Sequence, residues 1–291
     1  LPIYPYLTPA LQNVLRVLDQ SETGPTTVTA GTATYVNNPG DGRAVITAGR
    51  RYVEVGPRLA SERRNVFRGA WGFKGDLGNV TDNFLTDLKY DVYYTYARSE
   101  DTLQLSNAIS RSKLQASLLS QGGAAPLCNI FGANITDACA KAISISATNT
   151  TVATQQVAQG SVTGNLFRLP AGPVGFSFGG EWRKTSATFR PDSFLSSGDV
   201  AGFNPGLPTQ GSVSVKEVFG EVRVPLLANT PFFKELTASG AFRYSDYSLD
   251  GVGGVWTSNG GLDWRVNSDV AFRGQYQRAI RAPNVSELYG G

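Results

Sequence analysis

The chain has 291 residues, enough for one large domain or two, and combines 33 Gly, 15 Phe and 12 Tyr with no Met and no His. Its formal net charge is only +3 and no Lys/Arg-rich run stands out, so nucleic acid is excluded as an expected partner. No stretch approaches the roughly 20 apolar residues of a membrane-spanning helix, a criterion that does not apply to membrane strands.

The first clear strand is predicted at residues 67–74, where Phe67, Trp71 and Phe73 alternate with small or basic residues. A second follows at residues 90–96, where tyrosines alternate with smaller side chains. Because successive side chains of a strand point to opposite faces, each segment has one apolar face. We assign the residues ahead of these strands, 1–43, to an external loop region.

The same alternation continues through the rest of the chain. It recurs at residues 162–166, 174–183, 217–224, 242–245, 262–266 and 272–277. In each case apolar side chains share one face, and taken together the opposite faces carry charges of both signs. The candidate residues on this charged face are Glu181, Arg183, Glu217, Glu221, Arg223, Arg243, Asp263, Arg265 and Arg273.

The connections between the strands are of two kinds. Short or medium turns are predicted at residues 79–87, 170–173, 228–235 and 267–269, and they alternate with longer connections, of which residues 100–153 form the longest. Short turns at one end and long loops at the other are typical of outer-membrane barrels, whose short turns face the periplasm. We therefore expect the four short turns to lie on the inner side of a membrane.

Alternation by itself fits two architectures equally. In a soluble all-β sandwich the apolar face would be the core, whereas in a barrel it would face lipid. Two features favour the barrel. Aromatic residues such as Trp71 and Trp264 recur near strand ends, where an interfacial girdle would place them. Glycines such as Gly69 and Gly240 share the apolar face, where they would leave holes in a packed core.

Several segments resemble one known family. Residues 276–289, YQRAIRAPNVSELY, closely resemble a "RAFRAP..SELF" segment of TonB-dependent outer-membrane receptors, and they follow a strand-turn-strand unit typical of these barrels. The segments at 167–192, 216–227, 240–248 and 127–132 look like the same family and occur in its order. The resemblance covers roughly residues 45–291.

This resemblance implies an all-β fold, an antiparallel transmembrane β-barrel segment that forms part of a 22-stranded barrel plugged by a separate N-terminal domain. Residues 44–291 would then be a partial barrel of eight to ten strands. We expect barrel sequence to be missing at both ends, because neither a plug nor a TonB box is present and an open sheet leaves two unpaired edges in a membrane.

The resemblance also implies a function in the bacterial outer membrane. A receptor of this kind binds a scarce solute, such as an iron chelate, a vitamin or an oligosaccharide, and imports it when TonB acts on the plug. The implied partners are the plug domain, TonB, outer-membrane lipid and a small-molecule substrate. The nine charged residues would face the lumen and the plug, or simply solvate the lumen. A passive porin-like barrel or a soluble β-rich binding domain is the alternative.

The sequence gives little support to enzymatic or metal chemistry. Glu217 with Glu221, or Glu181 with Asp263, could be imagined as the carboxylate pair of a glycoside hydrolase. However, every charged stripe looks alike, and there is no His, nucleophile elbow or phosphate-binding loop. We expect no catalytic activity, no metal and no cofactor.

The long connections hold the remaining candidates. Phe131, Phe194 and Phe203 could stack on a ligand there, or pack the loops themselves. Cys128 and Cys139, the two cysteines of the chain, lie close together in sequence, and at an oxidising cell surface we expect them to form a disulfide. A metal site or two free thiols are the alternatives.

Overall fold

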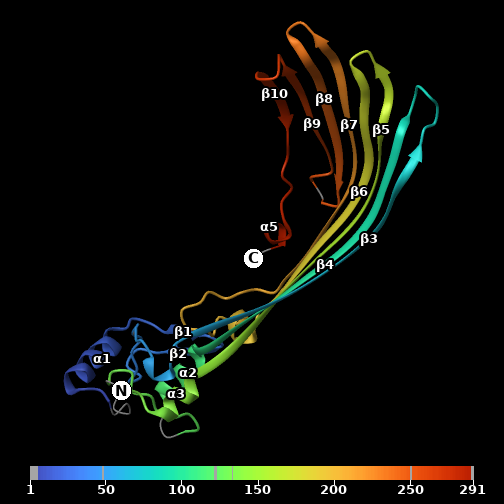
Figure 1. Ribbon diagram of the computed structural model, residues 1–291. Helices are drawn as coiled ribbons and strands as arrows, with labels where there is room; N and C mark the ends of the chain where they lie inside the picture. The colour runs from blue at the N-terminus through green and yellow to red at the C-terminus, as the bar shows by residue number, and fades with distance from the viewer. Residues whose placement is uncertain (1–5, 48, 121–122, 133, 250, 290–291) are drawn as a thin grey trace.

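The computed structural model describes residues 6–47, 49–120, 123–132, 134–249 and 251–289. Its main feature is an eight-stranded antiparallel sheet in which strands that follow one another in sequence are neighbours in space. Figure 1 shows the sheet as a single curved layer with β3 at one edge and β10 at the other. Within the described residues the sheet stays open. The chain is thus all-β in its main architecture, as predicted.

Several strands are much longer than the alternation predicts. The strands are β3 (Leu59–Gly78), β4 (Thr86–Ile109), β5 (Ser144–Leu169), β6 (Gly172–Arg190), β7 (Thr209–Thr230), β8 (Phe233–Tyr247), β9 (Gly254–Arg265) and β10 (Ala271–Arg278). β4 has 24 residues and β5 has 26, whereas about 9–11 suffice to cross a bilayer. The prediction of a loop over residues 100–153 is therefore wrong at both ends. There the ladder continues through segments that hold no aromatic residue and only a short apolar alternation, such as Leu103 with Leu105.

The connections divide between the two ends of the sheet. The turns between β3 and β4, β5 and β6, β7 and β8, and β9 and β10 all lie at one end, at the top of Figure 1. The two long connections, 110–143 and 191–208, lie at the other end, together with the short connection 248–253. The predicted separation of short turns from long connections is therefore present in the fold.

The cross-strand register gives the sheet one apolar face. Phe178 is paired with Val162 and Gly220, and Phe176 is paired with Val222. Because residues directly opposite each other in a ladder point to the same face, these pairs define a continuous surface. Its large exposed members include Phe67, Trp71, Phe73, Val92, Phe178, Val218, Phe242, Trp256, Leu262, Phe272 and Tyr276. No second layer covers these side chains in the described part of the chain, which argues against a soluble sandwich.

The end with the long connections carries a compact unit that we call the loop module, comprising the described residues within 6–58, 110–143 and 191–208. It holds α1 (Pro9–Ser21), the hairpin of β1 (Thr26–Ala30) and β2 (Ala33–Asn37), the 3-10 helix η1 (Val53–Val55), α2 (Arg111–Leu119), α3 (Asp137–Ile143) and α4 (Ser193–Ser196). A last short helix, α5 (Val285–Tyr289), follows β10. The described part of residues 1–43 thus contains a helix and a hairpin.

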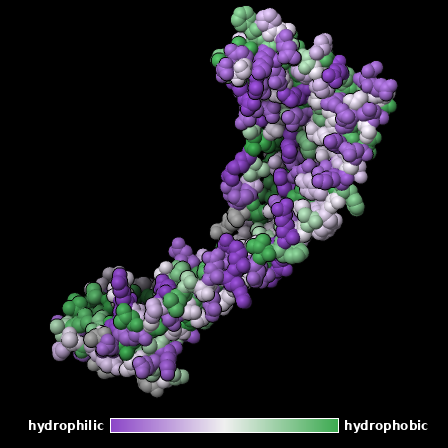
Figure 2. Space-filling view, in the orientation of Figure 1, coloured by the Kyte–Doolittle hydropathy of each residue, from purple (hydrophilic) through white to green (hydrophobic). Residues whose placement is uncertain are grey.

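Local sequence explains the helix that opens the loop module. Thr8 caps α1 by accepting a hydrogen bond from the backbone N–H of Leu11 at 3.3 Å, and Pro9 occupies the first turn, where its missing N–H costs nothing. Leu15 is buried, whereas Val14 and Val17 are exposed. Figure 2 shows apolar side chains gathered over this end of the molecule. Among the described residues, no helix is long and apolar enough to cross a membrane.

Candidate functional site on the polar face

The face opposite the apolar one carries all nine charged residues singled out in the sequence. Glu181 is paired with Glu217, Arg223 with Ser239, and Asp263 with Arg273, so that these residues point to the same side of the sheet. We call this the polar face. The register therefore brings the nine onto one surface. Contact of this surface with a plug stays a prediction.

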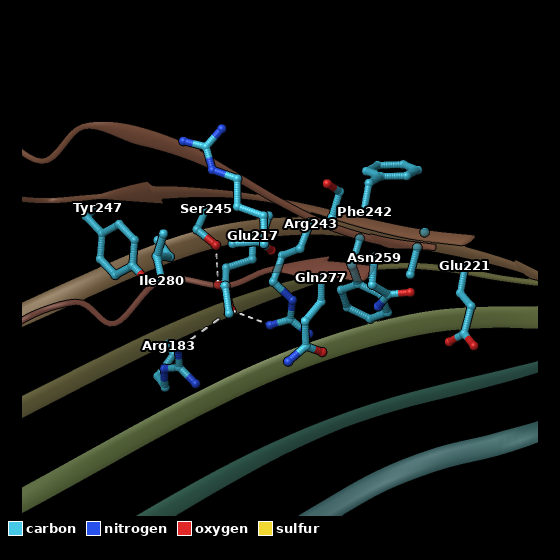
Figure 3. Close-up of a pocket in the computed structure, with 17 residues that line it drawn as sticks. Arg183, Glu217, Glu221, Phe242, Arg243, Ser245, Tyr247, Asn259, Gln277 and Ile280 are labelled. Carbon is cyan, nitrogen blue, oxygen red and sulfur yellow. Dashed lines mark hydrogen bonds and ion pairs between the residues drawn. The ribbon is translucent and has the colours of Figure 1, made fainter. Parts of the chain in front are cut away.

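The most buried charge on the polar face is Glu217. Its side chain is only 3% exposed, and its carboxylate accepts a hydrogen bond from Ser245 Oγ at 2.5 Å and another from Arg243 Nη1 at 2.9 Å. Arg183 Nη2 lies 3.6 Å from the same carboxylate. Figure 3 shows the three partners converging on Glu217 from both sides.

The strands around Glu217 explain why this arrangement is stable. β7 supplies Glu217, β6 supplies Arg183, and β8 supplies both Ser245 and Arg243, so the acid lies on a central strand with a base on each neighbour. A buried carboxylate is tolerated only when it is paired and hydrogen-bonded. Arg243 is further fixed by the ring of Phe219, 5.1 Å from the guanidinium carbon.

A cavity of about 470 Å³ lies over this cluster. Its lining includes Arg183, Glu217, Arg243, Asn259, Gln277 and Ile280. Carboxylate, guanidinium and amide groups meet there, so the cavity suits a polar or charged group from another segment or molecule. Glu217 already holds three partners, an arrangement that favours an electrostatic and positioning role over proton transfer.

A second cavity, of about 370 Å³, lies nearer the short turns. Arg223 Nη2 pairs with Glu235 there at 2.9 Å, and Arg273 pairs with Asp263. Arg265 also lines this cavity. Within the described residues it has no ion-pair partner, and neither does Glu221 beside the first cavity. These two charges are available to an additional partner.

The three phenylalanines of the long connections have different surroundings. Phe194 packs against the buried cluster of Ala108, Ile145 and Val200, which favours the alternative that it packs the loops. Phe203 and Phe131 are exposed, and the guanidinium of Arg58 lies 4.9 Å from the ring of Phe203. Ligand contact by Phe131 and Phe203 stays a prediction. Among described residues, no cluster of His, Cys, Asp and Glu could hold a metal ion.

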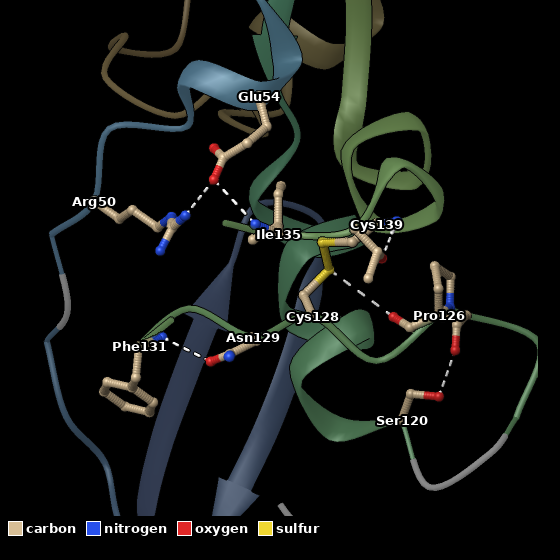
Figure 4. The surroundings of a disulfide bond; sticks show 11 residues. Arg50, Glu54, Ser120, Pro126, Cys128, Asn129, Phe131, Ile135 and Cys139 are labelled. Carbon is tan, nitrogen blue, oxygen red and sulfur yellow. Dashed lines mark hydrogen bonds and ion pairs between the residues drawn. A yellow bond between two sulfur atoms is a disulfide. The ribbon is translucent and has the colours of Figure 1, made fainter. Parts of the chain in front are cut away.

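The predicted disulfide is present. Cys128 and Cys139 are bonded, with their Cα atoms 5.4 Å apart, and both side chains are fully buried. They pack with Ile109, Ile135 and Ile143 in the core of the loop module. The bond therefore holds an apolar core together at a position where the sequence shows only a loop (Figure 4).

Two polar contacts that the sequence did not reveal join the segments of the loop module. Arg50 donates to the carbonyl oxygens of Gly132 at 2.6 Å and Ile130 at 3.2 Å and also pairs with Glu54, which accepts from the backbone N–H of Ile135 at 3.0 Å. These contacts tie η1 to the disulfide loop, as Figure 4 shows. Charged residues are common in loops, and nothing in the sequence distinguishes the two that form this contact from the others.

The second contact centres on Asp199, which is fully buried. Its carboxylate accepts from Ser110 Oγ at 2.6 Å and from the backbone N–H and Oγ of Ser112, at 2.6 and 2.8 Å. A Cβ on Gly31, in the β1–β2 turn, would lie 1.7 Å from the Asp199 carboxylate, so this hairpin approaches closely only because residue 31 is glycine. Three separate segments of the loop module therefore meet at one carboxylate.

The contact around Glu54 predicts an acid-sensitive loop module. Hydrogen bonds from its own backbone N–H and that of Ile135, together with Arg50, lower the pKa of Glu54 against the opposing effect of burial. A lowered pKa means that stabilisation is present above the ordinary glutamate pKa of about 4.3 and is lost as pH falls through the folded-state value. We expect amide exchange at Ile135, corrected for intrinsic rates, to accelerate over that acidic range.

Glu54→Gln should remove this acid response and leave the Ile135 amide equally protected from exchange at neutral pH and across that acidic range. Asp137→Asn, which changes an exposed acid in the first turn of α3, serves as the control and should retain the wild-type response. If the Glu54 variant kept the wild-type pH profile, the contact would not be the source of the acid sensitivity.

Comparison with known proteins agrees with this geometry. Residues 15–291 match the family described as TonB dependent receptor-like, beta-barrel. No curated protein and no solved structure matches the chain. The family match spans the whole eight-stranded sheet, including its apolar and polar faces. The chain therefore belongs to the TonB-dependent receptors, as part of the outer-membrane β-barrel of that family.

Proposed function

We propose that this protein is an active importer, energised by TonB through a plug domain, that takes up a scarce solute across the outer membrane of a Gram-negative bacterium. The observation that carries the proposal is the division of the sheet into an apolar face and a charge-rich face in a chain of this family. The apolar face supplies the surface for lipid. The polar face supplies charged side chains that line the lumen and can bind charged partners.

The dimensions of the apolar face support a position of the sheet within the lipid bilayer. On β9, Trp256 and Trp264 share this face with Leu262 between them. Eight steps of about 3.3 Å separate the two tryptophans by about 26 Å along the strand, which at a strand tilt of about 40° corresponds to about 20 Å of membrane depth, within the apolar band of about 25 Å of outer-membrane barrels. On β7 and β8 the band ends at the paired charges Lys216 and Asp246.

The polar face supports the role of the plug. Glu181 and Glu217 balance the charges of Arg183 and Arg243. Glu221 and Arg265, in contrast, have no ion-pair partner among the described residues. A plug domain with complementary charges would pair with such positions. We propose that all nine candidate residues face the lumen and that these two unpaired charges contact the plug directly.

The loop module is the proposed entry for the solute. It lies at the end opposite the short turns, and exposed Phe131 and Phe203 offer rings that can stack on a chelate, a vitamin or a sugar. Arg58, held over Phe203, would add a positive charge beside one ring. An iron chelate, a vitamin or an oligosaccharide remains the proposed substrate class.

Uptake measurements test this function. Cells that produce the intact receptor, with and without TonB, would be supplied with radiolabelled ferric chelates, cobalamin and maltooligosaccharides in turn. We expect one class to accumulate only when TonB and the proton-motive force are both present. Cells lacking the receptor provide the control. Accumulation that continues at the same rate without TonB would instead identify a passive pore.

A further inference from the structure

The chain leaves the sheet after β10 and crosses the polar face. β10 pairs with β9 only as far as Arg278 and Ser258, although β9 itself begins at Gly254. Residues 279–289, which we call the strap, do not continue along β9 and instead bring α5 against β7. Figure 1 shows this segment running along the hollow side of the curved sheet. The strap thus spans the positions of two intervening strands.

The contact at Gly211 shows which face the strap covers. Gly211 and Glu217 lie six positions apart on β7 in an uninterrupted ladder with β6, so both point to the polar face. A Cβ on Gly211 would lie 2.1 Å from Cδ2 of Tyr289. The Tyr289 hydroxyl also reaches the carbonyl oxygen of Ser212, at 3.5 Å. The ring can lie flat against β7 only because residue 211 has no side chain.

The strap is a preformed turn rather than a loose tail. Arg281 Nη2 pairs with Glu287 at 2.6 Å, and Asn284 and Glu287 cap each other, with the Asn284 N–H donating at 2.8 Å and the Glu287 N–H donating at 2.9 Å. Val285, in the same turn, is buried. A segment that is already ordered loses less conformational entropy when it docks. These residues form the RAPNVSELY stretch of the sequence, which the proposed function leaves unexplained.

We propose that the strap is an internal constriction that closes the side of the Glu217 cavity facing the loop module. Gln277 and Ile280, where β10 ends and the strap begins, line that cavity together with Arg183 and Glu217. In a barrel whose polar face is the lumen, the strap lies inside the lumen and narrows it independently of any plug. This inference rests on the proposed function, because it requires the polar face to line a solute path.

Cross-linking in intact outer membranes tests the placement. The double variant Gly211→Cys/Tyr289→Cys of the full-length receptor should form a disulfide on mild oxidation, read as a linked peptide pair by mass spectrometry. The control is Gly175→Cys/Tyr289→Cys, because Gly175 points to the same face from β6 and a Cβ at that position would meet no atom closer than 4.0 Å. Linkage in the first pair alone supports the strap. No linkage, or equal linkage in both pairs, overturns it.

Permeability measurements test the constriction in cells without TonB, so the result does not depend on active import. Gly211→Leu should displace the strap by overpacking and raise the entry of vancomycin about tenfold, equivalent to about 1.4 kcal/mol in the closed-to-open equilibrium. Gly175→Leu, on the same face with open space, should match the wild type. Glu287→Ala removes the cap and the ion pair without adding bulk, and it should also raise entry. This variant keeps the test possible if Gly211→Leu fails to assemble.

Equal vancomycin entry in Glu287→Ala, Gly211→Leu and Gly175→Leu cells would overturn the constriction. In that case, TonB-dependent uptake by the wild-type receptor would still support the proposed function. Conversely, passive uptake by the wild type together with strap-dependent permeability would contradict the proposed function alone.

Discussion

Val222→Arg should prevent the receptor from assembling in the membrane. Val222 is paired with Phe176 and Gly240 on the apolar face, and it lies midway between Val218 and Leu226 on β7. A lipid-facing Arg near the bilayer midplane costs about 2–4 kcal/mol in a transmembrane barrel. Heat-modifiable mobility of the receptor extracted from outer membranes would measure the folded fraction, which we expect to fall sharply.

The same residue introduced on the other face serves as the control. Ser177→Arg is on the neighbouring strand and points to the polar face, directly opposite Glu221. The new guanidinium would meet a carboxylate that has no ion-pair partner among the described residues, so assembly should be close to that of the wild type. An equal loss of folded receptor in both variants would show that the two faces do not differ in their surroundings. It would contradict the insertion of this sheet in the membrane.

Period-two alternation predicted the faces of the sheet because it depends only on neighbouring residues. The face of the nine charged positions followed directly from it, and the end of the sheet with short turns followed from the lengths of the connections. The long outer parts of β4 and β5 were missed because they hold no aromatic residue and their apolar alternation is short, with Leu103 and Leu105 in one strand and Ile145 and Ala147 in the other. Strand pairing in these parts is visible only in the register.

Contacts between distant segments could not be predicted from the sequence. Asp199 becomes a junction because the β6–β7 connection meets Ser110 and the β1–β2 turn, and no local pattern records that meeting. The same holds for Ser245, which donates to Glu217 from the neighbouring strand. The disulfide was predictable because the chain has only two cysteines, but its position at the centre of an apolar core was not.

Arg243→Ala should destabilise the folded barrel far more than Arg223→Ala, although both arginines pair with a glutamate at 2.9 Å. The difference lies in the carboxylates. The Glu217 side chain is 3% exposed, whereas that of Glu235 is 45% exposed. Removing one partner of a buried pair leaves an uncompensated charge and costs about 3–5 kcal/mol, whereas an exposed pair contributes about 0–1 kcal/mol.

For Arg243→Ala the cost should lie at or below the lower end of that range, because Arg183 and Ser245 remain as partners of Glu217. Equilibrium unfolding of the refolded receptor in urea, in lipid vesicles, would give both free energies. The double variant Arg243→Ala/Glu217→Gln should recover part of the loss, since an amide at position 217 leaves no charge to compensate. Equal destabilisation by Arg243→Ala and Arg223→Ala, with no recovery in the double variant, would show that the burial of Glu217 does not set the strength of its ion pair with Arg243.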